Sequence, residues 1–128
     1  MAPITLLYAG LLGLISLVLS AAVGAKRGAS GISLGLGEDP DLLVANRRHG
    51  NFVEYVPLAL ILMGLLEVNG VSPTAMHLFG IVLTVARICH PVGLHHQEGH
   101  HALRAIGALG TFVLTAVMSV WAIVLFLS

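Results

Sequence analysis

A stripe of polar residues at the start of a long apolar stretch has the composition of a ligand site. The stretch RRHGNFVEYVP contains Arg47, Asn51, Glu54 and Tyr55. On an α-helix these positions, at i, i+4, i+7 and i+8, share one face. Arginines bind carboxylates through forked hydrogen bonds, and a glutamate binds an ammonium group. Together with the basic residues of the later segments, described next, the stripe suits a small, mainly anionic ligand that also carries an amine.

Three more polar residues are expected near the same end of the protein. Arg87 and His90 lie three residues apart in a later apolar segment, and Arg104 begins the last one. Charged side chains at membrane depth are costly, so they normally face the interior of a helix bundle or an aqueous cavity. A second interpretation stays open, in which Arg47 and Glu54 neutralise charges on neighbouring helices and only fix the packing.

The composition indicates an integral membrane protein. Hydrophobic residues make up 57% of the 128 positions and charged residues 9%, whereas soluble domains carry about 25% charged residues. Six basic residues balance six acidic ones, so the net charge gives no reason to expect a nucleic-acid partner. The single cysteine, Cys89, excludes an intrachain disulfide and a multi-cysteine metal site.

Four apolar segments are long enough to span a bilayer as helices, which takes about 20 residues. We expect them at about Ile4 to Ala25, Pro40 to Asn69-Gly70, Ser72-Pro73 to Leu94, and Ala102 to Leu127. Asp39 and Ser72 each precede a proline, as is typical of helix starts. KRGASGISLGLGEDPD, between the first two segments, reads as a loop. The chain is thus predicted to be all-α, a single transmembrane four-helix bundle over residues 1–128.

The basic residues predict the orientation in the membrane. Lys26, Arg27, Arg47 and Arg48 flank the first loop and Arg104 follows the third, whereas the connection VNGVSP between the second and third segments has none. Cytoplasmic loops carry an excess of lysine and arginine. The first and third loops are therefore expected in the cytoplasm, with both termini on the far side.

The pattern Arg-x-x-x-Asn-x-x-Glu, leading into an apolar helix through Tyr-x-Pro, resembles the signature of the MAPEG family, the membrane-associated proteins in eicosanoid and glutathione metabolism. The order of the four segments, the glycine-rich first loop, ARICHPVGL in the third segment and the basic residue that opens the fourth are also similar. The resemblance, which is to small bacterial members, implies a homotrimer in the bacterial inner membrane. It further implies that glutathione binds between adjacent subunits near the cytoplasmic face.

The resemblance also implies roles for individual residues. The positions that match the family's glutathione-holding residues in the second segment are Arg47, Asn51, Glu54 and Tyr55. His90 occupies a position where some relatives also have histidine and others tyrosine. Arg104 matches the arginine that stabilises the glutathione thiolate, and either Lys26 or Arg27 would reach a glutathione carboxylate. Arg87, on the same face as His90, is counted with the glutathione-binding residues.

Activation of a thiol is the chemistry expected of this site. A free thiol has a pKa of about 8.5, so most glutathione is unreactive at neutral pH. A fixed guanidinium in a region shielded from water favours the thiolate and creates a nucleophile. We hypothesise that Arg104 does this for a hydrophobic electrophile or lipid hydroperoxide that arrives through the lipid bilayer. The protein would then be a membrane-bound glutathione transferase or peroxidase, with glutathione as co-substrate.

Two positions depart from the family pattern. Leu94 stands where several relatives place a tyrosine close to the ligand, and Ala105 follows Arg104 where some prostaglandin-forming relatives have serine. Prostaglandin isomerase activity is therefore not expected. The missing aromatic hydroxyl keeps a second hypothesis open, a non-catalytic membrane scaffold that retains the pocket and binds a lipid or a protein partner.

Four histidines crowd the turn between the third and fourth segments: His95, His96, His100 and His101. Imidazole groups suit zinc, copper or nickel. No HxxxH pair lies on a clearly defined helix and no cysteine pair accompanies the histidines. A polar turn at the membrane interface is therefore favoured over a metal site.

Overall fold

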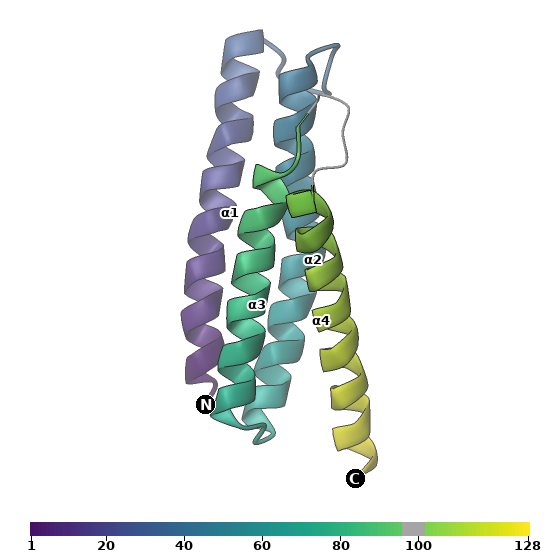
Figure 1. The fold of residues 1–128 in the computed structure, drawn as a ribbon. Helices are drawn as coiled ribbons and strands as arrows, with labels where there is room; N and C mark the ends of the chain where they lie inside the picture. The colour runs from purple at the N-terminus through teal and green to yellow at the C-terminus, as the bar shows by residue number, and fades with distance from the viewer. Residues whose placement is uncertain (96–101) are drawn as a thin grey trace.

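The computed structural model describes residues 1–95 and 102–128, and the regular structure within these residues is helical throughout. They form four α-helices: α1 (Pro3–Ser30), α2 (Pro40–Val68), α3 (Pro73–Val92) and α4 (Ala102–Leu127). The helices run alternately up and down the bundle, with both termini at one end and the loop between α1 and α2 at the other (Figure 1). The shortest helix, α3, stops below the ends of α1 and α2 (Figure 1).

The distribution of apolar side chains is that of a membrane protein. Each of the four described helices is long and apolar enough to cross a bilayer. Leu12, Met63 and Leu83 are fully buried between the helices, whereas Leu14 and Leu17 are 64% and 66% exposed on the outside. Helices that are apolar on their outer faces as well as their inner faces are stable in lipid. The chain is therefore a multi-pass membrane protein, as predicted.

Local sequence signals set the starts of two helices. The Asp39 carboxylate accepts hydrogen bonds from the backbone N–H groups of Asp41 (2.9 Å) and Leu42 (3.1 Å). The Ser72 hydroxyl accepts one from the backbone N–H of Ala75 (3.4 Å). In both cases a proline follows, at a position where a missing N–H costs nothing. The predicted starts of α2 and α3 are confirmed.

The structure corrects the predicted end of the first helix. The helix continues to Ser30, beyond the expected end at Ala25, because no proline or left-handed residue interrupts it before Gly31, where φ is 69°. Lys26 and Arg27 therefore lie near the end of α1 and not in a loop. The loop before α2 is correspondingly shorter.

A glycine lets α3 and α4 approach each other at backbone distance. A Cβ atom added to Gly107 would lie 2.6 Å from both the carbonyl oxygen of Ala86 and the backbone nitrogen of His90. Such a separation is far inside van der Waals contact, so a side chain at this position would force the helices apart. The contact lies close to the end of α3, which is Val92 and not the predicted Leu94.

Candidate functional site

A polar cavity of about 500 Å³ lies between α2, α4 and the end of α3. Its lining consists of Arg47, Asn51, His90, Leu94, Arg104, Ala105 and Ala108. Four of these are predicted site residues, and they come from three different helices. Two guanidinium groups, an imidazole and an amide thus face one concave space. A cavity with these groups suits an anionic ligand rich in hydrogen-bond acceptors.

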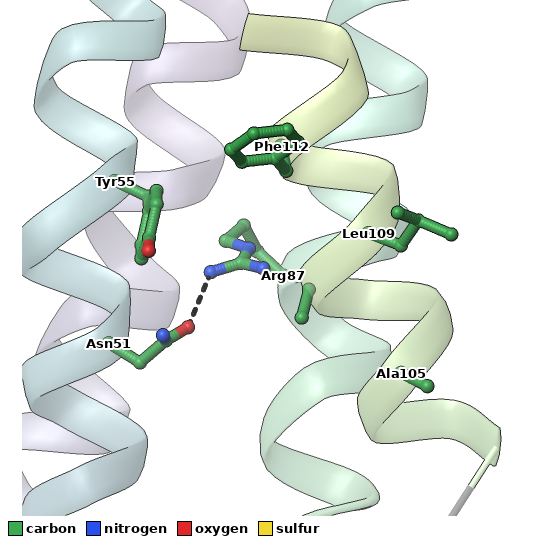
Figure 2. Close-up of a pocket in the computed structure, with 7 residues that line it drawn as sticks. Asn51, Tyr55, Arg87, Ala105, Leu109 and Phe112 are labelled. Atoms are coloured by element: carbon green, nitrogen blue, oxygen red, sulfur yellow. Dashed lines mark hydrogen bonds between the residues drawn. The ribbon is translucent and has the colours of Figure 1, made fainter.

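A second cavity, of about 330 Å³, adjoins the first and is mostly apolar. Its lining consists of Asn51, Tyr55, Arg87, Ala105, Ala108, Leu109 and Phe112. Figure 2 shows Asn51 and Tyr55 projecting from α2 toward Arg87, with Phe112 on α4. The two cavities meet at Asn51, Ala105 and Ala108, which line both. A polar and an apolar compartment therefore lie side by side between the same helices.

Arg87 connects α3 to the other two helices of the site. It is only 1% exposed. Its Nη1 donates to Oδ1 of Asn51 (2.9 Å) on α2, and its Nη2 donates to the carbonyl oxygen of Gly107 (2.7 Å) on α4. The Asn51 bond is drawn in Figure 2. Arg87 thus lies in the cavity wall with two of its donor groups bonded to protein, and sequence reasoning gave no sign of these bonds.

Arg47 and Glu54 contact each other along α2. The Nη1 atom of Arg47 lies 3.9 Å from Oε1 of Glu54, and the two side chains are 57% and 51% exposed. An exposed ion pair of this length contributes less than about 1 kcal/mol to stability. The alternative interpretation, in which the two charges are neutralised by neighbouring helices, is not supported within residues 1–95 and 102–128, where the ion-pair partner of each is the other.

Arg104 is placed by a backbone contact between α3 and α4. A Cβ atom added to Gly93 would overlap the backbone nitrogen of Arg104 and the backbone of Leu103, so this approach requires glycine. The Arg104 side chain is exposed and lines the polar cavity. Gly93 is not among the predicted site residues. Its importance becomes visible only once both helices have been placed.

Lys26 and Arg27 lie away from the polar cavity. The Nζ atom of Lys26 is 2.6 Å from Oδ2 of Asp41. The Nη1 atom of Arg27 donates to the carbonyl oxygens of Ile32 (3.3 Å) and Gly35 (2.8 Å) in the following loop. A contribution of the basic end of α1 to the cavity is therefore not made within a single copy of the chain.

Arg48 bonds to the backbone just beyond the end of α3 and is not among the residues that line the polar cavity. Its Nε (3.1 Å) and Nη2 (2.6 Å) both donate to the carbonyl oxygen of Leu94. Consecutive residues of a helix point in directions about 100° apart, so Arg47 reaches the cavity while Arg48 reaches the end of α3. In the sequence, Arg48 indicates only the orientation of the chain in the membrane. Leu94 lies two residues beyond the end of α3, so this contact depends on how the two segments pack and has no local signal in the sequence.

Comparison with family models matches residues 5–124 to the MAPEG family. The chain belongs to this family. Among curated proteins it is similar to the inner membrane protein YecN from the K12 and O6:H1 strains of Escherichia coli. In each case the identity is 38% over 94 residues, which cover 73% of this chain and 72% of the relative. No solved structure matches the chain.

Family membership confirms the resemblance inferred from the second segment. In this MAPEG protein the signature residues Arg47 and Asn51 line the same cavity as His90 and Arg104. Tyr55, one residue after the signature glutamate, lines the apolar cavity. The signature therefore belongs to the part of the bundle where the two cavities meet.

The histidines of this MAPEG protein fall into separate places. His90 is 6% exposed and lines the polar cavity. His95 lines another cavity, of about 400 Å³, between α1 and α2. His96, His100 and His101 lie outside the described residues, and the choice between a polar turn and a metal site rests largely on them. Among the described residues, no three His, Cys, Asp or Glu side chains are grouped so that they could hold a metal ion.

Proposed function

We propose that this MAPEG protein binds glutathione in the polar cavity and activates its thiol toward hydrophobic electrophiles or lipid hydroperoxides. It would act as a membrane-bound glutathione transferase or peroxidase. The observation that carries the proposal is that Arg47, Asn51, His90 and Arg104 line one cavity, which meets an apolar cavity. The similar Escherichia coli protein is named as an inner membrane protein, which supports the bacterial inner membrane as the location.

The charges of the site complement those of glutathione, which carries carboxylates and an ammonium group. Arg47 binds a carboxylate with its forked donors, and Glu54 binds the ammonium group. The 3.9 Å contact between Arg47 and Glu54 is weak enough for a ligand to replace. Tyr55 contributes its ring and hydroxyl. The cavity of about 500 Å³ falls within the range of roughly 300–1,000 Å³ found for small-molecule sites.

Arg104 is the proposed catalytic residue. Its guanidinium faces the polar cavity from the first turn of α4. A permanent positive charge beside the glutathione sulfur favours the thiolate over the thiol. The thiolate then attacks an electrophile that occupies the apolar cavity, where Phe112 and Leu109 provide the lining. The bond to sulfur forms as the leaving group departs: chloride from a chlorinated nitrobenzene, or the alcohol released when the O–O bond of a hydroperoxide breaks. His90 assists by hydrogen bonding within the polar cavity.

A homotrimer completes the site in this proposal. Lys26 and Arg27 lie away from the polar cavity in one copy, so a basic residue of α1 reaches the ligand only from a neighbouring copy.

A non-catalytic scaffold is the second candidate function, and Leu94 is the observation that favours it. Leu94 lines the polar cavity, and its carbonyl group is held by Arg48. An aliphatic side chain at this place offers no hydroxyl to a reacting sulfur. In this alternative the pocket holds a lipid or a partner protein and no group is transferred.

The proposed function is tested with the detergent-purified protein and with Arg104→Ala. Wild type is expected to conjugate glutathione to a chlorinated nitrobenzene or to reduce an organic hydroperoxide, and to show the ultraviolet absorbance of a bound thiolate. Arg104→Ala should bind glutathione with nearly unchanged Kd and lose the thiolate absorbance and the turnover. Ser119→Ala, which removes a hydroxyl bonded within α4, is the matched control and should behave as wild type.

The outcome also separates the two candidate functions. Thermal stabilisation by glutathione without turnover on any electrophile or hydroperoxide would support the scaffold. A thiolate signal that survives in Arg104→Ala would remove Arg104 from its proposed role. No binding of glutathione by wild type would refute the proposed ligand itself.

A further inference from the structure

Arg87 is a buried cation at membrane depth that the proposed chemistry leaves without a task. It is 1% exposed, and its Nε has no hydrogen-bond partner among the described residues. Buried ionic groups are often replaceable by apolar residues at little cost in stability. Packing alone is therefore a poor reason for an arginine here. The two bonds that Arg87 does form indicate another reason.

The first bond fixes the arginine itself. Its Nη2 donates to the carbonyl oxygen of Gly107 (2.7 Å), which also accepts a hydrogen bond from the Thr111 hydroxyl (2.9 Å). Because Gly107 lacks a Cβ, α4 lies close enough to α3 for this carbonyl group to meet the guanidinium. The acceptor belongs to the backbone of a packed helix and cannot rotate. Arg87 is thus anchored from α4.

The second bond fixes the Asn51 amide. The Arg87 guanidinium can only donate hydrogen bonds, whereas an amide group has an oxygen that accepts and an NH₂ group that donates. Arg87 therefore holds Oδ1 of Asn51, at 2.9 Å. A flipped amide would set its NH₂ group against a positive charge and lose the bond. Arg87 consequently determines which way the Asn51 amide faces.

The NH₂ group of the Asn51 amide is available to a ligand in the cavities. Asn51 lines both the polar and the apolar cavity. Its Nδ2 forms no hydrogen bond with the described residues, while Oδ1 is occupied by Arg87. The side chain therefore offers a donor to a ligand and keeps its acceptor for the protein.

We propose that Arg87 is a positioning residue that acts on the ligand through Asn51. It makes Asn51 an obligate donor, so the site accepts a carboxylate or carbonyl oxygen of the ligand at Nδ2 and rejects an ammonium group there. The inference rests on the proposed glutathione site, in which the ammonium group then goes to Glu54. Arg87 itself does not touch glutathione.

The inference is tested by a double-mutant cycle on Arg87→Met and Asn51→Ala, with glutathione binding measured by calorimetry in detergent. Arg87→Met alone should raise Kd about tenfold, the effect of one hydrogen bond to a charged group. In the Asn51→Ala background the same change should raise Kd less than about twofold, because the group it positions is gone. A tenfold effect in both backgrounds would overturn the inference, since Arg87 would then act independently of Asn51.

The rate parameters separate positioning from a general structural role. Arg87→Met should raise KM for glutathione, with kcat and the thiolate absorbance at saturation unchanged. Arg87→Lys, which keeps one donor, should restore part of the affinity. The inference would be contradicted if Arg87→Met lowered kcat and also lost the thiolate absorbance at saturating glutathione.

Asn51→Asp provides an independent test that leaves Arg87 in place. Aspartate keeps an oxygen for Arg87 but turns a second oxygen toward the ligand, so it should weaken glutathione binding more than Asn51→Ala does. Binding by Asn51→Asp equal to that of wild type would overturn the inference even if Arg87→Met does not fold. Failure of wild type to bind glutathione is a different result, which would remove the proposed function and this inference together.

Discussion

At the end of the bundle that holds both termini, Glu67 and Tyr8 bond to other parts of the protein, whereas at the opposite end Arg47, Asn51 and Arg104 face a cavity. The Glu67 carboxylate, near the end of α2, accepts hydrogen bonds from the backbone N–H groups of Ile4 (2.8 Å) and Thr5 (2.7 Å) in α1. Close by, the Tyr8 hydroxyl lies 3.1 Å from Nδ1 of His77. These groups satisfy each other without a ligand.

The opposite end leaves several polar groups open. Arg47 and Glu54 are more than half exposed and meet only at 3.9 Å. Arg104 is exposed at the polar cavity, and the Asn51 amide is bonded on one side only. Arg47, Asn51 and Arg104 line the same cavity, but they form no hydrogen bonds with one another among the described residues.

The difference distinguishes polar groups that stabilise the bundle from those available to a ligand. In lipid, an unsatisfied polar group costs several kcal/mol, so an internal partner is worth most where no water or ligand can reach. Removal of a paired group should lower stability and leave binding intact. Removal of a cavity group should do the reverse.

The largest effect is expected for Gly107→Val, which should lower both the stability of the bundle and the affinity for glutathione and so would not follow the contrast between the two ends. The new side chain would collide with the backbones of Ala86 and His90, which lie 2.6 Å from the position of its Cβ, and should cost about 3 kcal/mol of stability. Glutathione binding should fall as well, because α4 carries Arg104. Gly110→Ala is the control: among the described residues its Cβ meets Ala86 Cβ alone, at the ordinary contact distance of 3.5 Å, and the melting temperature should be unchanged or slightly raised.

Glu67→Ala should lower the free energy of unfolding by about 1–2 kcal/mol, the usual cost of removing a helix cap. The start of α1 has no side-chain cap of its own, so its N–H groups would lose their partner. Thermal unfolding in detergent measures the loss. The Kd for glutathione should stay at the wild-type value, and a large change in Kd would show that the two ends are coupled.

Arg47→Ala should have the opposite signature. The Kd for glutathione should rise about tenfold through the loss of a charge-assisted hydrogen bond, while the melting temperature in the absence of glutathione stays unchanged because the pair with Glu54 is exposed. Calorimetry and thermal unfolding on the same preparation measure both. A marked fall in the melting temperature with Kd preserved would assign Arg47 to the structure and not to the ligand.

The smallest effect is expected for Tyr8→Phe. The ring stays packed against Gly80 and the bundle, and only the hydrogen bond to His77 is lost. Stability should fall by about 1 kcal/mol or less. Turnover and Kd should not change, which makes this variant a control for effects that reach the site from a distance.

The helices and several helix ends followed from the sequence because their causes are local. Asp39 and Ser72 accept hydrogen bonds from N–H groups two or three residues ahead, so a short pattern is sufficient to place them. The end of α1 was predicted too early because KRGAS resembles a loop in composition, yet its backbone stays helical until Gly31.

The candidate site was predictable only as a set of residues on helix faces. The spacing of Arg47 and Asn51 placed both on one face, and the structure brings them to a cavity shared with His90 and Arg104; their roles toward glutathione stay proposals. The bonds between helices could not be predicted. Whether Arg87 meets Asn51, or Arg48 meets a carbonyl group, depends on how far each helix is rotated and how closely it packs.

The short length of α3 has a consequence for how reactants reach the two cavities. It has 20 residues against 29 in α2, a difference of about 14 Å at 1.5 Å per residue. α3 therefore stops short of α2 at the end of the bundle that carries the polar cavity, whose lining includes His90 in the last turn of α3 and Leu94 just beyond it. In the proposed reaction, glutathione, which is soluble in water, would reach the polar cavity from the aqueous side, and an apolar electrophile would reach the apolar cavity from the lipid. The two reactants would then meet where the cavities adjoin, and neither would have to cross the medium in which it is poorly soluble.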